Sequence, residues 1–355
     1  MRRLSFALWL AASSLVMGCE ARIPGVEPPD LAQAGDGGVG GNGGPDDLAT
    51  AADLTTAADL LVPEDLTTTE PPDLTTTPPD LTTPPDLATA SVRLRIVGSN
   101  LTTGNNQKYE APGTRILQGL HPDVVLIQEF NVGDNSQTTV RAWVTSTFGD
   151  SFSYYREPTG SIPNGVISRY PIVDAGYWDD NDTISDRNLV WARIDVPGDK
   201  DLWAVSVHLK ADSGEQARRR VQALALVAQV QANIPTGDYL VVGGDLNAQS
   251  RSTTSEPCLG VLSQIVDVAG PWPVDQGGDA DTNANRNKPE DWVMFDPDLK
   301  GKQVSVAIGA ASFVNGLVFD SRRYMPLGDV PPVLSTDSAA PSMQHMAVVK
   351  DVQLP

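Results

Sequence analysis

Two polar side chains of the kind that bind cations and phosphates follow an apolar run at residues 239–242. Asp245 and Asn247 lie two positions apart, so at the end of a strand both would point to the same side. Gly243 and Gly244 precede them and would let another group approach the backbone closely. A carboxylate and an amide on one face suit an oxygen-rich site for a metal ion and a phosphate. The same spacing also occurs in ordinary turns.

A polar residue at the point where an apolar run stops recurs along the chain. In chain order these residues are Asn100, Glu129, His208, Asp245, Asn247, Asp291 and His345. Carboxylate and amide oxygens select Mg²⁺, Mn²⁺ or Ca²⁺ over softer metals. An imidazole near its working pKa can move a proton at neutral pH. A common edge at which all seven side chains meet would explain their positions.

The elements that must position these residues are read from apolar periodicity. Strands are expected at residues 92–97, 124–127, 165–168, 190–196, 202–208, 239–242, 291–295, 304–308 and 345–349. Helices are expected at residues 115–120, 140–148 and 214–234. On the last helix, Val221, Leu224, Val227 and Val230 have helical spacing and form the expected apolar stripe. Strands outnumber helices and the helices lie between strands, which favours an α+β sandwich over a doubly wound parallel sheet.

Seven short segments in a consistent order resemble the endonuclease/exonuclease/phosphatase superfamily, which has the deoxyribonuclease-I-like fold. They are residues 95–100, 122–129, 164–172, 206–209, 244–248, 291–293 and 344–348. The resemblance covers nearly all of residues 92–352. It implies a four-layer αββα sandwich with the site at one rim of the paired sheets. It also implies metal-dependent hydrolysis of a phosphate ester.

The resemblance further implies a role for each matched residue. Glu129 would be the principal metal ligand, with Asn100 beside it, and the ion would be Mg²⁺, with Mn²⁺ or Ca²⁺ as alternatives. Asp245 would orient or deprotonate the attacking water, and Asn247 would donate a hydrogen bond to the phosphate. His208 would contact the phosphate or assist the leaving group.

The remaining pair is a carboxylate and an imidazole: Asp291 would hydrogen-bond His345 and fix its tautomer.

The chain departs from the family at Gln344, where relatives usually have an aspartate, so a second metal contact is in doubt. We expect weaker metal binding or a single ion, with activity retained. Arg187 and Tyr155 lie where family members often place phosphate-facing groups, and each could equally be a salt-bridge or packing residue.

The first 90 residues have no apolar periodicity of a folded domain. Residues 1–18 have a basic start and an apolar stretch, which predicts a secretory signal. A small residue before Cys19 resembles the lipobox of bacterial lipoproteins, so Cys19 would be lipidated; a plain signal peptide or an uncleaved anchor is the alternative. Residues 19–90 are rich in Gly, Pro, Thr and Asp and repeat the motif Pro-Pro-Asp-Leu, which predicts a disordered, semi-rigid tether.

The charge of the chain is divided unevenly. Of the net −20, most belongs to residues 19–90, which contain 14 acidic residues and one basic residue. Residues 91–355 suit one domain and remain mildly acidic, which argues against tight binding of nucleic acid by charge alone. Cys258 is the only cysteine there, so no disulfide can form within the domain. Arginines 218–220 are expected on a solvated helix face, and residues 279–283 in a polar loop that approaches the rim.

Three functions remain open from the sequence. The leading hypothesis is a surface-tethered, Mg²⁺-dependent phosphodiesterase, most simply a nuclease that degrades extracellular DNA or RNA. We expect a monomer that is exported as a lipoprotein and held in the cell envelope, at the outer membrane or cell surface, by its lipid anchor. A phospholipid or inositol-phosphate hydrolase is the second reading. The third is a non-catalytic surface-binding module on the same scaffold.

Overall fold

The computed structural model describes residues 91–181 and 187–355. The predicted signal peptide (1–18), with the tether and Cys19 (19–90), lies outside the described residues, so the domain boundaries expected there stay predictions. In the described part of the chain, no helix is both long and apolar enough to cross a membrane.

Seven strands form the first sheet: β1 (Val92–Ser99), β2 (Val124–Ile127), β3 (Ser153–Arg156), β4 (Gly165–Ser168), β10 (Gln303–Val304), β13 (Leu317–Phe319) and β14 (Ala347–Leu354). Their order is β10-β14-β1-β2-β4-β3, and β13 also pairs with β14. Only β1 and β2 run parallel to each other; the other pairs are antiparallel.

Five strands form the second sheet: β5 (Ile172–Trp178), β6 (Leu189–Ile194), β7 (Leu202–His208), β8 (Tyr239–Asp245) and β9 (Asp291–Phe295). They are ordered β5-β6-β7-β8-β9, with β7 and β8 parallel and the other pairs antiparallel. The order β14-β1-β2-β4-β3 therefore has the same sequence of strand directions as β9-β8-β7-β6-β5. A separate hairpin consists of β11 (Val306–Ile308) and β12 (Ala311–Phe313).

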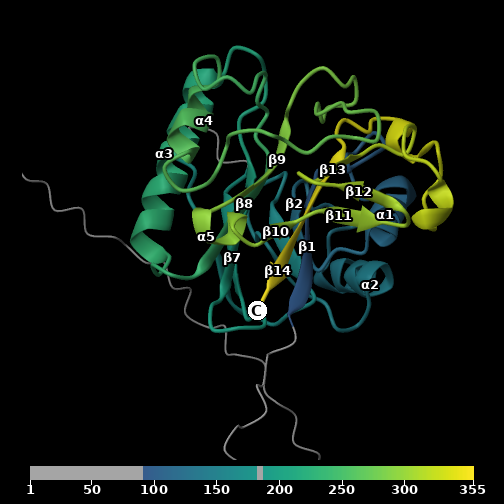
Figure 1. Ribbon diagram of the computed structural model, residues 1–355, viewed down its shortest axis with the longest axis horizontal. Coiled ribbons are helices and arrows are strands. Elements are labelled where there is room, and N and C mark those ends of the chain that lie inside the picture. Colours follow the sequence, from purple (N-terminus) through teal and green to yellow (C-terminus); the bar gives the residue numbers. More distant parts are fainter. Residues whose placement is uncertain (1–90, 182–186) are drawn as a thin grey trace, which may run out of the picture. The chain divides into compact units, whose positions relative to one another are not determined.

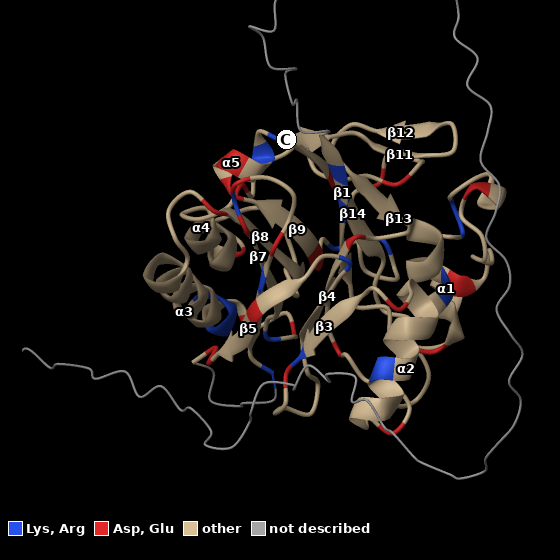
Figure 2. Cartoon of the chain, turned by 90° about the horizontal axis from the view of Figure 1, so that it is seen from below, with Lys and Arg blue, Asp and Glu red and all other residues tan. Residues whose placement is uncertain are grey.

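Four helices cover the outer faces of the two sheets: α1 (Ala111–Leu120), α2 (Gln137–Phe148), α3 (Gln216–Asn233) and α4 (Pro257–Leu262). The short helix α5 (Pro297–Lys300) instead contributes Leu299 to the cluster between the sheets, and two 3₁₀ turns are η1 (Leu327–Asp329) and η2 (Asp337–Ala339). Figure 1 shows α3 and α4 on one side of the strands and α1 and α2 on the other. The view from below shows the same arrangement (Figure 2).

Three apolar clusters fill the spaces between four layers. Neighbouring residues of a strand point to opposite faces, so Val125 packs with α1 and α2 whereas Leu126 packs between the sheets. In the second sheet, Val241 joins Leu126 in the middle cluster, and Val242 packs with α3 and α4. These three interfaces confirm the predicted four-layer αββα sandwich.

The direction of the strands places their polar ends at one rim. The parallel pairs β1–β2 and β7–β8 both end there, and the antiparallel strands β9 and β14 begin there. All seven strand-end residues predicted from the sequence lie at these ends or within two residues of them.

Two expectations about elements are wrong in part. On α3, Val227 and Val230 are buried, but Val221 and Leu224 are 45% and 40% exposed. The buried face instead includes Ala223, Leu226 and two polar residues, Arg219 and Gln222, which have buried partners that apolar spacing does not reveal. The strand expected at 304–308 is divided: β10 pairs with β14, and β11 turns away to pair with β12.

The expected solvated face at 218–220 is also wrong for its middle residue, because Arg219 is fully buried. Its guanidinium makes a bidentate ion pair with the buried Glu256 and donates to the carbonyls of Lys210 and Asp212. Glu256 in turn accepts from the backbone N–H of Gln249 at 2.8 Å. This pair connects α3 to the loops that follow β7 and β8.

Candidate active site

The carboxylate of Asp245 lies at the centre of the rim. It is 1% exposed, at the end of β8. From the first sheet, the amide of Asn100 donates to Asp245 Oδ2 at 3.2 Å and faces Glu129 Oε1 at 3.5 Å. Asn100 therefore joins the two carboxylates, one from each sheet.

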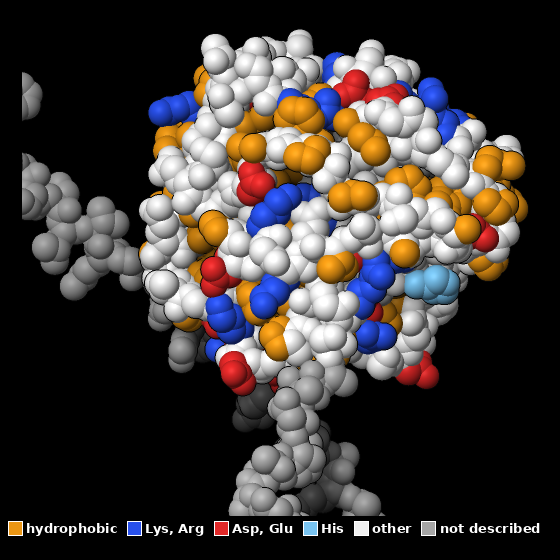
Figure 3. All heavy atoms as spheres, viewed as in Figure 1, with side chains coloured by type: hydrophobic (Ala, Val, Ile, Leu, Met, Phe, Trp, Pro, Cys, Tyr) orange, Lys and Arg blue, Asp and Glu red, His pale blue; other side chains and the backbone are white. Residues whose placement is uncertain are grey.

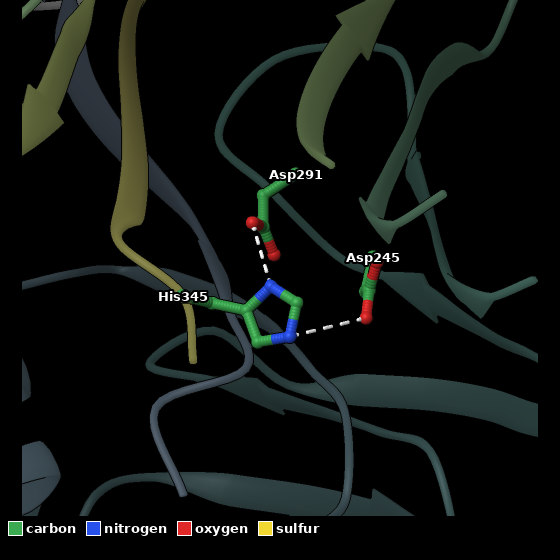
Figure 4. Close-up of side chains that lie close together, drawn as sticks. All are labelled: Asp245, Asp291 and His345. Carbon is green, nitrogen blue, oxygen red and sulfur yellow. Dashed lines mark hydrogen bonds and ion pairs between the residues drawn. The ribbon is translucent and has the colours of Figure 1, made fainter. Parts of the chain in front are cut away.

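Two imidazoles approach the same oxygen of this carboxylate. His208 Nε2 lies 3.2 Å from Asp245 Oδ2, and His345 Nε2 lies 3.5 Å from it. The second ring nitrogen of His345 is 3.0 Å from Asp291 Oδ2. Figure 4 shows the His345 ring lying between the two aspartates, with one nitrogen directed at each. The contact predicted between Asp291 and His345 is therefore present.

Burial and these neighbours perturb the titration of the cluster. Burial alone would raise the pKa of Asp245, but the imidazoles of His345 and His208 outweigh it, and that pKa lies below its usual range. Burial raises the pKa of Asp291 to about 7, against the opposing effect of His345. Burial lowers an imidazole pKa, yet Asp291 and then Asp245 raise the pKa of His345 to about 10. At neutral pH His345 is thus cationic, whereas the sequence suggested an imidazole near its working pKa.

The backbone around the site has an uncommon conformation. Glu129 and Asn247 have φ angles of 49° and 50°, in the left-handed region that non-glycine residues seldom adopt and that is concentrated at functional sites. Gly243 has no room for a side chain, because a Cβ there would lie 2.5 Å from the carbonyl oxygen of Trp292. Gly244 has a φ of +129°, which favours glycine. The close approach expected at these glycines is present.

The spacing of Asp245 and Asn247 left two interpretations open, an ordinary turn and a site at a strand end, and Asn247 has features of both. Its backbone N–H donates to Asp245 Oδ1 at 2.8 Å, as in an Asx turn, and its side chain is buried at the rim. The side-chain amide donates to the carbonyl of Leu209 at 3.1 Å, just after His208. Asn247 therefore connects the ends of β7 and β8, and its contact with a phosphate stays a prediction.

The sequence profile of the Endonuclease/Exonuclease/phosphatase family matches residues 114–299, which is more than half of the chain. The chain belongs to this family. Members of the endonuclease/exonuclease/phosphatase family are hydrolases that act on phosphoester bonds, and they generally use a divalent metal. A search of curated proteins found no match.

Solved structures resemble the chain at low sequence identity. A functionally unknown conserved protein from Enterococcus faecalis has 10% identity and a TM-score of 0.51, over 74% of this chain and all of its own, and it supports the fold alone. An endonuclease/exonuclease/phosphatase from Beutenbergia cavernae has 17% identity and a TM-score of 0.48, over 74% of this chain and 72% of its own. The beta toxin of Staphylococcus aureus has 16% identity and a TM-score of 0.44, over 72% and 99%.

The donor atoms around Glu129 fit a hard divalent cation. Asn100 Oδ1 is buried and has no hydrogen-bond partner among the described residues, and a buried acceptor of this kind is costly unless something binds it. The Nδ2 atom of the same amide faces Glu129 Oε1 and Asp245 Oδ2, so a half-turn of the amide would direct Oδ1 to that place. Amide and carboxylate oxygens are the ligands that Mg²⁺, Mn²⁺ and Ca²⁺ prefer. Glu129 and Asn100 would hold the ion, which would neutralise charge on the phosphoryl oxygens.

A second group could also hold a metal. Single ligand atoms of Asp245, Asp291 and His345 lie within 4.8 Å of one another, and all three residues are buried. However, both ring nitrogens of His345 already face carboxylates, and its raised pKa means that a cation would have to displace a proton. The place beside Glu129 and Asn100 is therefore the better one for a cation.

The two further phosphate contacts expected from the sequence, Arg187 and Tyr155, lie in different surroundings. Arg187 is buried and directs Nη1 toward the carbonyl of Leu209, at 3.5 Å, the same carbonyl that binds Asn247. Tyr155 lies in β3 and packs against the cluster between the sheets, where burial raises its pKa to about 12. Among the described residues, no hydrogen bond joins Tyr155 to the rim, so packing describes its position. The side chain of Gln344 is exposed.

Three further residues belong to the rim and were not singled out from the sequence. The hydroxyl of Thr102 donates to Glu129 Oε2 at 2.7 Å. Thr282 accepts from the backbone N–H of Asp291 at 2.7 Å, within the polar loop predicted to approach the rim. Glu290 lies 3.9 Å from His345 Nδ1. For Thr102 and Glu290 the only available signal was their nearness to matched residues in sequence, and for Thr282 it was the polar loop expected near the rim.

Proposed function

We propose that this chain hydrolyses phosphodiester bonds with Mg²⁺, and that its substrate is nucleic acid, DNA or RNA. The observation that carries the proposal is the buried Asp245, whose carboxylate contacts two imidazoles and the Asn100 amide that also faces Glu129. Ionised carboxylates, a cationic imidazole and oxygen ligands for a hard cation are the groups that a phosphoryl-transfer site needs.

The titration of the site suggests how the roles are divided. Asp245 has a pKa below its usual range, so it is a weak base and would orient the attacking water through a hydrogen bond rather than remove its proton. His345, cationic at neutral pH, would hold a phosphoryl oxygen or donate a proton to the leaving group. Asp291 would keep His345 charged and fixed in orientation. His208 would contact the phosphate from the neighbouring strand.

The surface suggests that affinity for nucleic acid comes mainly from the site itself. Acidic and basic positions are scattered over the folded part (Figure 2), and the face in Figure 3 intersperses hydrophobic, acidic and basic side chains. Binding through a broad basic face would give a steep dependence on salt. We therefore expect Michaelis constants that depend only weakly on salt concentration.

A substrate panel with a matched variant tests the proposal. The purified full chain is incubated with Mg²⁺ and plasmid DNA, single-stranded DNA, RNA, sphingomyelin or a phosphoinositide. Cleavage of DNA or RNA should be abolished by EDTA and by Glu129→Ala, and retained by Glu215→Ala, which alters a glutamate at the start of α3. Nucleic-acid cleavage that survives both EDTA and Glu129→Ala would contradict the proposed site. Hydrolysis of a lipid alone would replace nucleic acid as the substrate, and no turnover of any ester would favour a binding module.

We also propose that the protein is an exported lipoprotein of the cell envelope, anchored through Cys19 and active as a monomer. The apolar stretch and the small residue before Cys19 support this localisation. Growth of the producing cell with a labelled fatty acid should label the wild-type chain and leave Cys19→Ser unlabelled. Equal labelling of both chains, or of neither, would refute lipidation at this cysteine.

A further inference from the structure

A buried tyrosine hydroxyl joins the ends of the two strands that carry Asn100 and Glu129. Tyr109 lies just before α1, is 4% exposed, and belongs to the cluster between the first sheet and its helices. Its ring packs against Phe130 and Trp143, with centroids at 6.5 and 5.3 Å. The ring is thus held by packing, and its hydroxyl points toward the rim.

The hydroxyl contacts both chain neighbours of Asn100. It donates to the carbonyl of Ser99 at 2.7 Å and accepts from the backbone N–H of Leu101 at 3.3 Å. The hydroxyl of Ser99 lies 3.1 Å from it as well. Since the residues on either side of Asn100 are bound to one atom, the position of the Asn100 backbone depends on Tyr109.

Tyr109 also holds the segment around Glu129. Its hydroxyl lies 3.2 Å from the carbonyl of Gln128, and its backbone N–H donates to the carbonyl of Asn131 at 2.9 Å. Glu129 therefore lies between two residues that Tyr109 holds, one through its hydroxyl and the other through its backbone. Its left-handed φ of 49° is a conformation that persists only when surrounding contacts impose it.

We infer that Tyr109 is the positioning residue of the cation site: its hydroxyl sets the spacing between Asn100 and Glu129 before any ion binds. The inference rests on the proposed function, because it takes these two residues as the metal ligands. Outer contacts that orient metal ligands typically change metal affinity by about 10- to 100-fold when they are removed.

The chain provides a matched control for removal of this hydroxyl. Tyr324 is buried to the same degree, at 2% exposure, in the same apolar cluster, and its hydroxyl donates to the carbonyl of Ile308 at 3.1 Å. Ile308 lies in the β11–β12 hairpin, which carries none of the residues of the rim. Tyr109→Phe and Tyr324→Phe therefore remove the same group from the same kind of environment.

The test is a calorimetric titration of the full chain with Mn²⁺ alone. It compares wild type with Tyr109→Phe, Tyr324→Phe and Glu129→Ala. Tyr109→Phe should bind Mn²⁺ about 10- to 100-fold more weakly, Tyr324→Phe should bind it as wild type does, and both should unfold at similar denaturant concentrations. Wild-type affinity in Tyr109→Phe, or an equal loss in Tyr324→Phe, would overturn the inference while leaving the proposed function intact. Wild type without Mn²⁺ binding, or Glu129→Ala with unchanged binding, would overturn the proposed metal site and the inference together.

Discussion

Lys350 offers a quantitative test of the electrostatic reasoning applied to the rim. It lies in β14, paired with Ile96 of β1, and is 7% exposed. Its ammonium group lies 5.1 Å from the ring centroid of Phe295, and in the described part of the chain no carboxylate forms an ion pair with it. A buried charge of this kind destabilises the folded state. Lys350→Met removes the charge and keeps an unbranched apolar stem.

The expected gain follows from the pKa of this lysine. Burial, with a smaller effect of Lys300, lowers the pKa of Lys350 from 10.5 to about 7. Each pKa unit corresponds to 1.36 kcal/mol, so the full penalty is up to about 5 kcal/mol. Below pH 7 both the folded and the unfolded chain carry the proton, and the whole penalty applies. Between pH 7 and 10.5 the unfolded chain binds more protons, so wild-type stability rises with pH and the penalty shrinks to about 2 kcal/mol at pH 9.

Denaturant unfolding of the full chain at pH 6 and pH 9 measures this difference. Lys350→Met should have a higher free energy of unfolding than wild type at pH 6, and the advantage should fall by more than half at pH 9. Lys200→Met is the control, because Lys200 is partly exposed in a surface ion pair with Asp298 and its loss should change stability little at either pH. A Lys350→Met chain no more stable than wild type at pH 6, or equally stabilised at both pH values, would refute the reasoning.

Two further predictions concern buried charges. Asp291→Asn removes the first of the charges that raise the pKa of His345; kcat should fall by about 10²- to 10⁴-fold, and the alkaline limb of the pH–kcat profile should move to lower pH. An unchanged alkaline limb would show that this limb reports the titration of a group other than His345. Arg219→Met leaves the fully buried Glu256 unpaired, which should cost about 3–5 kcal/mol in denaturant unfolding. The double variant Arg219→Met/Glu256→Leu should recover most of that loss, and a double variant as unstable as the single one would contradict the buried-charge explanation.

The sequence could predict the rim because strand ends are visible in it. An apolar run shows where a strand stops, and two parallel pairs of strands that end together bring Glu129 and Asp245 to one place. The contacts of Thr102 and Tyr109 could not be predicted, since they depend on left-handed backbone at Glu129 and on how a loop returns to the sheet. Arg219 was misjudged because its buried partner comes from a segment 37 residues away.

The departure at Gln344 has a structural context that the sequence did not supply. The side chain of Gln344 is exposed, and its backbone carbonyl accepts from the N–H of Ala284, in the loop that contributes Thr282. The charge around His345 comes instead from Asp291 and Asp245, both buried and both in contact with its ring. Because buried charges are screened far less than exposed ones, these two dominate the electrostatics of the imidazole. Position 344 can therefore lack an acid and leave the carboxylate–imidazole pair intact.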